Sequence, residues 1–188
     1  MTRLAAVPEL PTIGPGHRPA LAAVALATVA AIALTLNHYG FSANGLGWSA
    51  VQLLLGFIAG WDILTRRILN VVVLPASLIV IAVRAAFEPS ALPEILVAGA
   101  VAFVVFVVLA VVGSGLGMGD VKLAGLLGLL LGRAALGALL AGVIAGGVAA
   151  ALLLASGRAG RKSKFAYGPY LALGGAVWIV VGSPPSLF

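Results

Sequence analysis

The sequence predicts an all-α protein: a polytopic bundle of about seven transmembrane helices (six to seven), with its N-terminus in the cytoplasm. Of the 188 residues, 62% are apolar and only 9% are charged, whereas a soluble domain carries about 25% charged residues. The mean hydropathy is +1.20. A soluble fold of this size needs a polar surface that this composition cannot provide, so lipid is the expected solvent.

Apolar runs separated by helix breakers predict the spans, each compared with the ~20 residues that a bilayer requires. The runs cover 19–36, 47–64, 71–87, 95–112, 121–131, 134–155 and 167–181. The fifth run is short, because eleven residues at ~1.5 Å each reach only about half of the hydrocarbon core. We expect a tight turn at Gly132-Arg133 between this run and the next. Residues 1–18, with three prolines, are expected to form a disordered cytoplasmic tail, and 19–188 to form one transmembrane domain.

The basic residues predict the orientation of the bundle. With the N-terminus inside, nine of the 11 Lys and Arg residues fall on the cytoplasmic side, and only Arg84 and Arg133 fall outside. Glu88 and Glu94 also lie outside. This asymmetry agrees with the positive-inside rule. Because the bases flank apolar runs instead of forming a patch, they are explained as topology signals, and nucleic acid is not expected as a partner.

The residue types that are scarce exclude several kinds of site. The chain contains no cysteine, which excludes disulfides, thiolate metal sites and cysteine nucleophiles. It contains two histidines, His17 and His38, too few for the usual histidine-based zinc site. We therefore expect no metal and no cofactor. Glycine is abundant, with 25 residues, and its spacing in 125–147 is typical of closely packed membrane helices.

Two of the five acidic residues are candidates for chemistry. Glu9 lies in the tail and Glu88 and Glu94 in an external loop, which leaves Asp62 and Asp120, the two aspartates of the chain. The predicted topology places both at the cytoplasmic ends of different spans. Two adjacent carboxylates in a poorly hydrated site share a proton, so that one can accept a proton from water while the other donates to a carbonyl.

Each aspartate also has a purely structural interpretation. Asp120 precedes an apolar helix and could be its N-cap. Asp62 could form an ion pair with Arg66 at the headgroup level. Position alone does not decide between these interpretations and a functional one. The glycines at 117 and 119 favour chemistry, because they give a backbone without side chains that an extended peptide could approach closely.

Three blocks of the sequence resemble the type IV prepilin peptidase family, in the short form that comprises the peptidase region alone. They are DILTRRILN at 62–70, GMGDVKL at 117–123 and FAYGPYLA at 165–172. The resemblance extends over about 47–181, and the second block contains the GxGD pattern of intramembrane aspartyl proteases. It implies that Asp62 and Asp120 are the catalytic pair of a transmembrane peptidase domain in the inner membrane.

The same resemblance implies a substrate and a location. Members of the family remove the short basic leader from prepilins and pseudopilins at the cytoplasmic membrane face, usually after a glycine. The expected partners are therefore such a leader segment and the lipid bilayer, while the sequence does not specify an oligomeric state. Long members also carry a cysteine-containing insert and a methyltransferase activity. Because the cysteines and the insert are missing here, no methyltransferase activity is expected.

Four residues are candidates for supporting roles: Gly117, Gly119, Lys122 and Asn70. Lys122 could attract a substrate carboxylate or tune Asp120, or it could be a topology signal. Asn70 could form a hydrogen bond across the site or cap the third span, and capping is the preferred interpretation.

The third block contains two tyrosines, and the first block departs from the family pattern at one position. Tyr167 and Tyr170 are interpreted as interfacial aromatic residues. Leu69 stands where the family usually has proline, which would start the next helix rigidly. The entry to the third span is therefore expected to be looser.

Two other classes of function are compatible with part of the pattern. One is a small ion-coupled transporter, in which the aspartates bind or relay a cation. The other is a non-catalytic membrane assembly partner of a pilus or secretion system. Transport predicts acids near the bilayer midplane and an internal repeat, whereas both aspartates are expected at one face and no repeat is found.

Overall fold

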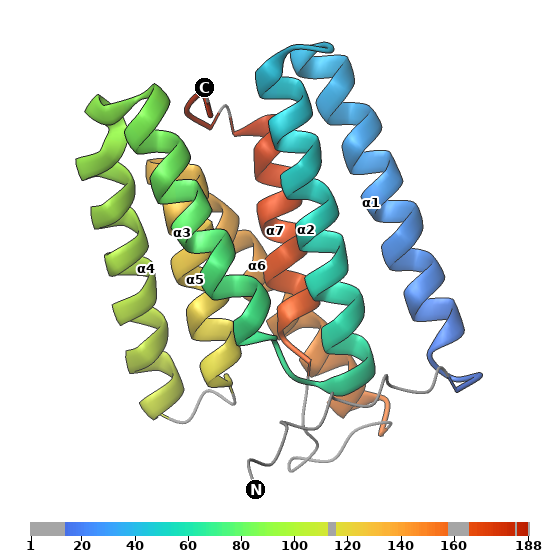
Figure 1. Cartoon of the computed structure of the whole chain (residues 1–188). Helices are drawn as coiled ribbons and strands as arrows, with labels where there is room; N and C mark the ends of the chain where they lie inside the picture. The colour runs from blue at the N-terminus through green and yellow to red at the C-terminus, as the bar shows by residue number, and fades with distance from the viewer. Residues whose placement is uncertain (1–13, 113–115, 158–165, 183, 188) are drawn as a thin grey trace, which may run out of the picture.

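The structure is a computed structural model that describes residues 14–112, 116–157, 166–182 and 184–187. This part of the chain contains α-helices and short 3₁₀ turns but no strand (Figure 1), which confirms the predicted all-α class. The elements are α1 (Arg18–Tyr39), α2 (Ala43–Thr65), α3 (Asn70–Phe87), η1 (Pro89–Ala91), α4 (Leu92–Val112), α5 (Met118–Leu131), η2 (Gly132–Ala134), α6 (Ala135–Ala155) and α7 (Gly168–Val181).

Most of these helices are long and apolar enough to cross a bilayer. Five stretches of the described chain meet both conditions: Arg18–Tyr39, Ala43–Thr65, Asn70–Phe87, Pro89–Val112 and Met118–Ala155. The last stretch comprises α5 and α6, which η2 separates, and α7 is a shorter apolar helix. Gly132 has a φ of 55°, a positive value that glycine adopts without steric cost. The polytopic helical bundle and the expected turn are therefore confirmed.

Several helices begin earlier than their apolar runs do. α2 starts at Ala43 because the side chain of Ser42 caps it, accepting a hydrogen bond from the N–H of Gly45 at 3.1 Å. α5 starts at Met118 and therefore has 14 residues, three more than the run that predicted it. The first turns of α2 and α5 contain polar residues and glycine, so the apolar runs begin later than the helices do. α1 begins at Arg18, and residues 1–13 of the expected tail lie outside the described residues.

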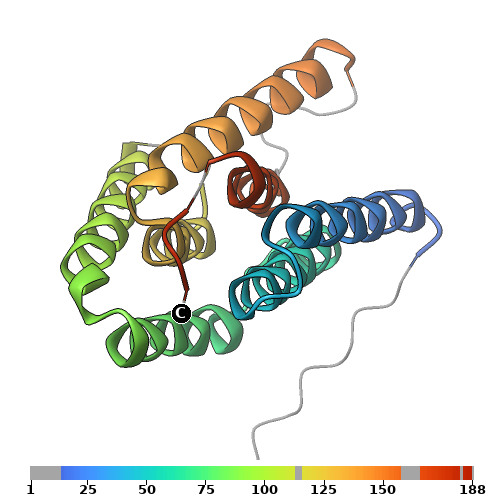
Figure 2. The same ribbon diagram turned by 90° about the horizontal axis from the view of Figure 1, so that it is seen from above.

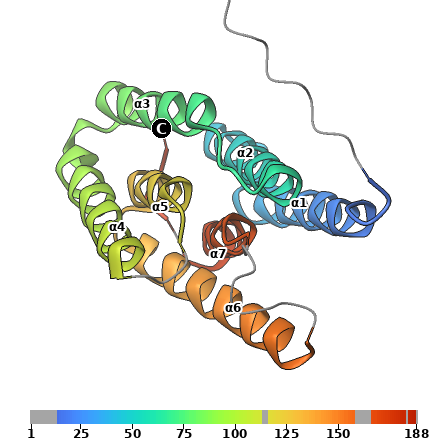
Figure 3. The ribbon, with the colours of Figure 1, turned by 90° about the horizontal axis from the view of Figure 1, so that it is seen from below.

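Successive helices run in opposite directions, so the bundle has two distinct ends. We call one the aspartate end; it carries Asp62, Asp120 and the first residues of α1, α3, α5 and α7 (Figure 1). α5 lies in the centre, against α3, α4, α6 and α7, while α1 lies outermost against α2 (Figures 2 and 3). Because protein surrounds α5, this helix can be apolar on every face. Its length, about 21 Å, is less than that of a lipid-exposed span.

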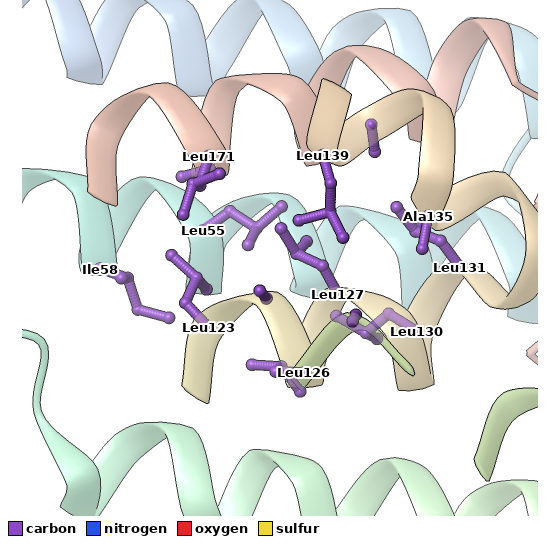
Figure 4. Packing of buried hydrophobic residues seen from close by; sticks show 14 of the residues in the cluster. Leu55, Ile58, Leu123, Leu126, Leu127, Leu130, Leu131, Ala135, Leu139 and Leu171 are labelled. Carbon is purple, nitrogen blue, oxygen red and sulfur yellow. The ribbon is translucent and has the colours of Figure 1, made fainter. Parts of the chain in front are cut away.

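Leucines join the central helix to its neighbours. Leu123 and Leu127 of α5 form one cluster with Leu55 of α2 and Leu171 of α7 (Figure 4). All four side chains are buried. This cluster holds α2, α5 and α7 together, and these are the three helices that build the candidate site.

Glycines allow two pairs of helices to pack in backbone contact. A Cβ on Gly128 of α5 would lie 2.6 Å from both the Ala98 carbonyl oxygen and the Gly99 Cα of α4. A Cβ on Gly174 of α7 would lie 3.1 Å from the Cα of Gly142 in α6. Both distances are shorter than an ordinary carbon contact, which agrees with the predicted packing role of these glycines.

The other end of the bundle is covered by residues 184–187, which we call the C-terminal segment. Arg84 of α3 is fully buried, pairs with Glu88 at 2.9 Å and donates a hydrogen bond to the carbonyl oxygen of Pro185 at 3.3 Å. The N–H of Leu187 donates to Asn44 Oδ1 at 2.7 Å. These contacts tie the segment to α3 and α2. It runs above α5 towards α3 (Figure 2).

Candidate active site

Asp62 lies in the last turn of α2, and its side chain is only 4% exposed. The helix ends because Arg66 adopts a left-handed conformation (φ 52°, ψ 37°) and donates its N–H to the carbonyl oxygen of Asp62 at 2.8 Å. The carboxylate Oδ2 accepts a hydrogen bond from the backbone N–H of Gly168 at 3.1 Å. Arg66 itself is exposed and forms no ion pair with Asp62. The ion-pair interpretation is therefore wrong, because the carboxylate is buried against α7.

Asp120 lies in the first turn of α5 and is also buried, with 8% of its surface exposed. Its Oδ2 accepts a hydrogen bond from the N–H of Gly117 at 2.9 Å. Gly117 is the N-cap of the helix, so Asp120 closes the first turn from the third helical position. The N-cap interpretation is therefore wrong about the position, although this carboxylate does stabilise the start of the helix.

The fold brings the two aspartates together at one end of the bundle. Gly168, whose N–H binds Asp62, and Gly119, the residue before Asp120, both lie against Ile68. The two aspartates therefore belong to one cluster although 58 positions (120 − 62) separate them in the sequence. Among the described residues, each Oδ2 accepts one backbone hydrogen bond and each Oδ1 accepts none. Each carboxylate therefore keeps an oxygen atom that can bind water. Such a pair can share a proton and perform general acid–base chemistry.

Ile68, in the loop between α2 and α3, packs between two glycines of the site. A Cβ on Gly119 would lie 2.8 Å from the Cβ of Ile68, and a Cβ on Gly168 would lie 3.1 Å from its Cδ1. A Cβ on Gly168 would also lie 2.7 Å from Asp62 Oδ2. The space beside Gly119 that was expected for a peptide therefore holds the side chain of Ile68. Ile68 was not predicted as a site residue, because its only signal in the sequence is its place in the DILTRRILN block.

A hydrogen bond between Lys122 and Asn70 joins α5 to α3 at the aspartate end. The Nζ of Lys122 donates to Asn70 Oδ1 at 2.9 Å. The N-cap of α3 is Leu69, without a side-chain cap. The preferred interpretation of Asn70 as a capping residue is therefore wrong. Asn70 is already the first helical residue, and its amide pairs with the lysine instead.

The position that departs from the family pattern has a regular backbone. Leu69 has φ −76° and ψ 115°, and its carbonyl oxygen accepts hydrogen bonds from Val72 and Val73 at 3.0 and 3.1 Å. This φ lies in the range that proline imposes. Leucine thus takes the conformation that proline would fix in advance.

Tyr167 contributes to the site from the start of α7. Its hydroxyl donates a hydrogen bond to the carbonyl oxygen of Val143 in α6 at 3.0 Å. A Cβ on Gly146 would lie 2.9 Å from its ring, so the ring packs closely on α6. The interpretation of Tyr167 as an interfacial aromatic residue missed these contacts, because nothing in the local sequence shows that α6 lies beside it.

Comparisons with known proteins bear on this arrangement. A family model described as the Type IV leader peptidase family matches residues 49–155, more than half of the chain. The matched region contains both aspartates and the four predicted supporting residues, and it ends before α7. No curated protein and no solved structure matches the chain.

Proposed function

The chain belongs to the type IV leader peptidase family, as its sequence motifs predicted, and we propose that it is an intramembrane aspartyl endopeptidase acting on prepilin-type substrates. In this proposal it removes the basic leader from a prepilin or pseudopilin, with Asp62 and Asp120 as the catalytic pair. The observation that carries the proposal is the burial of these two carboxylates, in the last turn of α2 and the first turn of α5, at the same end of a helical bundle.

The chemistry follows from one proton shared by two carboxylates. The ionised aspartate accepts a proton from a water molecule as the water oxygen attacks the carbonyl carbon of the scissile peptide bond. The protonated aspartate donates its proton to the carbonyl oxygen. One hydroxyl of the tetrahedral intermediate then gives its proton to the ionised aspartate as the carbonyl re-forms, the other aspartate protonates the nitrogen, and the carbon–nitrogen bond breaks. The pair is left with one shared proton, as at the start. Neither a covalent enzyme intermediate nor a metal is required.

The local hydrogen bonds support separate roles for the two aspartates. Each carboxylate is held at Oδ2 by a backbone N–H, from Gly168 for Asp62 and from Gly117 for Asp120. These donors come from different elements, so the orientation of each side chain is fixed separately. Backbone donors do not titrate, and they therefore hold both groups in place in either protonation state.

We further propose that the aspartate end faces the cytoplasm of a cell whose inner membrane holds the protein. The excess of basic residues predicted for this side supports that orientation. A basic leader would then meet the site before translocation. The proposal covers peptidase activity alone, since the chain has no cysteine-containing insert.

The transporter and assembly-partner alternatives have less support. Ion coupling places acids near the middle of the membrane, whereas Asp62 and Asp120 lie in the last turn of α2 and the first turn of α5. The family match favours a peptidase.

Co-expression with a prepilin tests the proposed function. Membranes that contain the wild-type chain should convert the prepilin to a shorter form, seen on a gel, with the new N-terminus identified by mass spectrometry. An unshortened prepilin, over a panel of prepilins and pseudopilins, would contradict the proposal. A transporter would instead show ion-coupled flux without any change in the prepilin.

A further inference from the structure

A glutamine is buried where three helices meet. Gln52 lies near the middle of α2, and only 1% of its surface is exposed. Its Nε2 donates a hydrogen bond to the carbonyl oxygen of Ala176 in α7 at 3.0 Å. The same Nε2 donates to Thr35 Oγ1 in α1 at 3.2 Å. One side-chain amide therefore joins α2 to both α7 and α1.

The partners of this amide fix its orientation. The carbonyl oxygen of Ala176 can only accept a hydrogen bond. Thr35 Oγ1 donates its own proton to the carbonyl oxygen of Ala31 at 2.7 Å, so it also accepts from Gln52. A flipped amide would turn its oxygen toward two acceptors. The side chain of Gln52 is therefore held in one arrangement, with both amide protons in use.

The oxygen of the same amide argues against a role in stability alone. Oε1 of Gln52 is buried and has no hydrogen-bond partner among the described residues. An unpaired acceptor in an apolar interior costs free energy, and an apolar side chain of comparable size would avoid this cost. In a bundle whose side chains are as apolar as lipid, a polar contact distinguishes one alignment of two helices from another. Buried polar residues specify register in this way.

A second hydrogen bond joins the same two helices at the aspartate end, from the N–H of Gly168 in α7 to Asp62 Oδ2 in α2. Along α2 the two bonds are ten positions apart (62 − 52), and along α7 they are eight apart (176 − 168). These separations correspond to about 15 and 12 Å of helix. Buried leucines of both helices pack together between the two bonds (Figure 4). Both bonds therefore belong to one antiparallel alignment of α2 and α7.

Helix α1 adds a third point of attachment. The hydroxyl of Tyr39 in α1 donates to the carbonyl oxygen of Ile179 in α7 at 3.0 Å. Ile179 lies about one turn beyond Ala176, which binds Gln52. Both α1 and α7 lie outside residues 49–155, which match the family model. Helices beyond the matched region therefore hold α2 in its alignment.

We propose that Gln52 is a positioning residue, which sets the register of α2 against α7 and thereby holds Asp62 on the N–H of Gly168. The inference rests on the proposed function, because this alignment affects cleavage only if Asp62 is catalytic. A slip of α7 by one turn, about 5.4 Å, would carry the N–H of Gly168 out of reach of the carboxylate. Gln52 opposes such a slip from a distance and does not touch the substrate.

A double-mutant cycle on prepilin cleavage tests this role. Gln52→Leu removes the amide, and Gly168→Ala disrupts the contact that the amide positions. Each variant should lower kcat at least tenfold and change KM less than twofold, because a misplaced carboxylate impairs the chemical step and not binding. The double variant should be no worse than Gly168→Ala alone, since both changes act through one contact. Losses that multiply to a hundredfold or more, or a normal kcat in folded Gln52→Leu, would overturn the inference.

Ser49→Ala is the matched control. Ser49 is also a buried polar residue of α2, but its hydroxyl donates to the carbonyl oxygen of Gly45 in its own helix. This variant should keep kcat within twofold of the wild-type value. Thermal unfolding in detergent establishes that each variant is folded. Gln52→Met, an unbranched apolar side chain of similar length, takes the same test if Gln52→Leu does not fold.

A distance measurement separates this inference from the proposed function, because it needs no cleavage. The native chain has no cysteine, so Phe57→Cys in α2 and Val177→Cys in α7, both at exposed positions, can carry spin labels. Double electron–electron resonance then gives the distance between them. Adding Gln52→Leu should shift or broaden this distance by at least ~1.5 Å, the rise of one helical residue, whereas adding Ser49→Ala should not.

The outcomes distinguish the two proposals. An unchanged distance in Gln52→Leu, with cleavage by the wild-type chain, would refute the positioning role and leave the peptidase standing. A changed distance, with no cleavage of any prepilin by the wild-type chain, would support the register and refute the peptidase.

Discussion

The carboxylate of Asp62 accepts a hydrogen bond from the backbone N–H of Gly168 at 3.1 Å, across 106 positions of the chain. This contact ties the last turn of α2 to the first turn of α7. It also extends the candidate site beyond the residues matched to the family, which end at 155. The hydrogen bond thus joins the sequence block at 62–70 to the block at 165–172.

Gly168→Ala should disrupt this contact. The new Cβ would lie 2.7 Å from Asp62 Oδ2, so α7 or the carboxylate must shift. We expect leader cleavage to fall at least tenfold and the free energy of unfolding to fall by about 1–3 kcal/mol. Cleavage rates and thermal unfolding in detergent measure the two effects.

Gly60→Ala is the matched control for this variant. Gly60 lies on α2, two residues before Asp62, and its Cβ would meet only Leu21 at an ordinary 3.7 Å. It should leave cleavage unchanged and stabilise α2 by about 0.5–1 kcal/mol. Equal activity of the Gly168 and Gly60 variants would show that the contact with Asp62 does not matter.

Gly119 and Ile68 should behave as a coupled pair. Gly119→Val should abolish cleavage while membrane insertion persists, because its side chain would overlap Ile68. Gly119→Ala should lower cleavage, since its Cβ would lie 2.8 Å from the Cβ of Ile68. Adding Ile68→Gly to Gly119→Ala removes that overlap and should restore part of the activity. If the double variant were no better than Gly119→Ala alone, Gly119 would serve the approach of the substrate and not the packing of the loop.

The hydrogen bond between Lys122 and Asn70 should contribute modestly to stability. Lys122→Met and Asn70→Ala each remove one partner of this partly solvated contact. A double-mutant cycle on the free energy of unfolding should give a coupling of about 0.5–1 kcal/mol. Cleavage should fall less than tenfold in each single variant. Strictly additive losses would show that the two side chains act independently.

Cysteine labelling tests the proposed orientation. The native chain has no cysteine, so Ser90→Cys and Ser156→Cys provide single reactive sites, both exposed and at opposite ends of the bundle. In intact cells an impermeant maleimide should label position 90 and not position 156, while a permeant one should label both. Labelling of position 156 alone by the impermeant reagent would invert the topology.

The spans and the aspartates could be predicted because both leave local signals in the sequence. A membrane helix is a long apolar run, and the turn at Gly132 interrupts such a run. Asp62 and Asp120 stand out because ionisable residues next to apolar spans are few. The start of α2 at Ala43 was missed, because its first turn contains the polar Asn44 and looks like a loop.

The contacts between helices could not be predicted in the same way. The pairing of Lys122 with Asn70 depends on α5 lying beside α3, and the position of Tyr167 depends on α6. Nothing in a 3.6-residue periodicity specifies which helix lies beside which. Ile68 is a single apolar residue in a loop. Its importance becomes visible only once Gly119 and Gly168 are seen on either side of it.

Asp62 and Asp120 should act as one catalytic unit. Asp62→Asn and Asp120→Asn should each remove cleavage almost completely, because a neutral amide can neither accept the proton of water nor pass one on. The double variant should be no worse than either single variant, since residues that act together are strongly non-additive.

The decisive measurement is the rate of leader cleavage by the wild-type chain and these three variants, in membranes with a metal chelator present throughout. Asparagine keeps the shape of the side chain, and folding is monitored by thermal unfolding. The aspartyl mechanism predicts full activity of the wild-type chain in chelator and no activity of any variant. Near-normal cleavage by either single variant, or loss of wild-type cleavage on adding chelator, would contradict it.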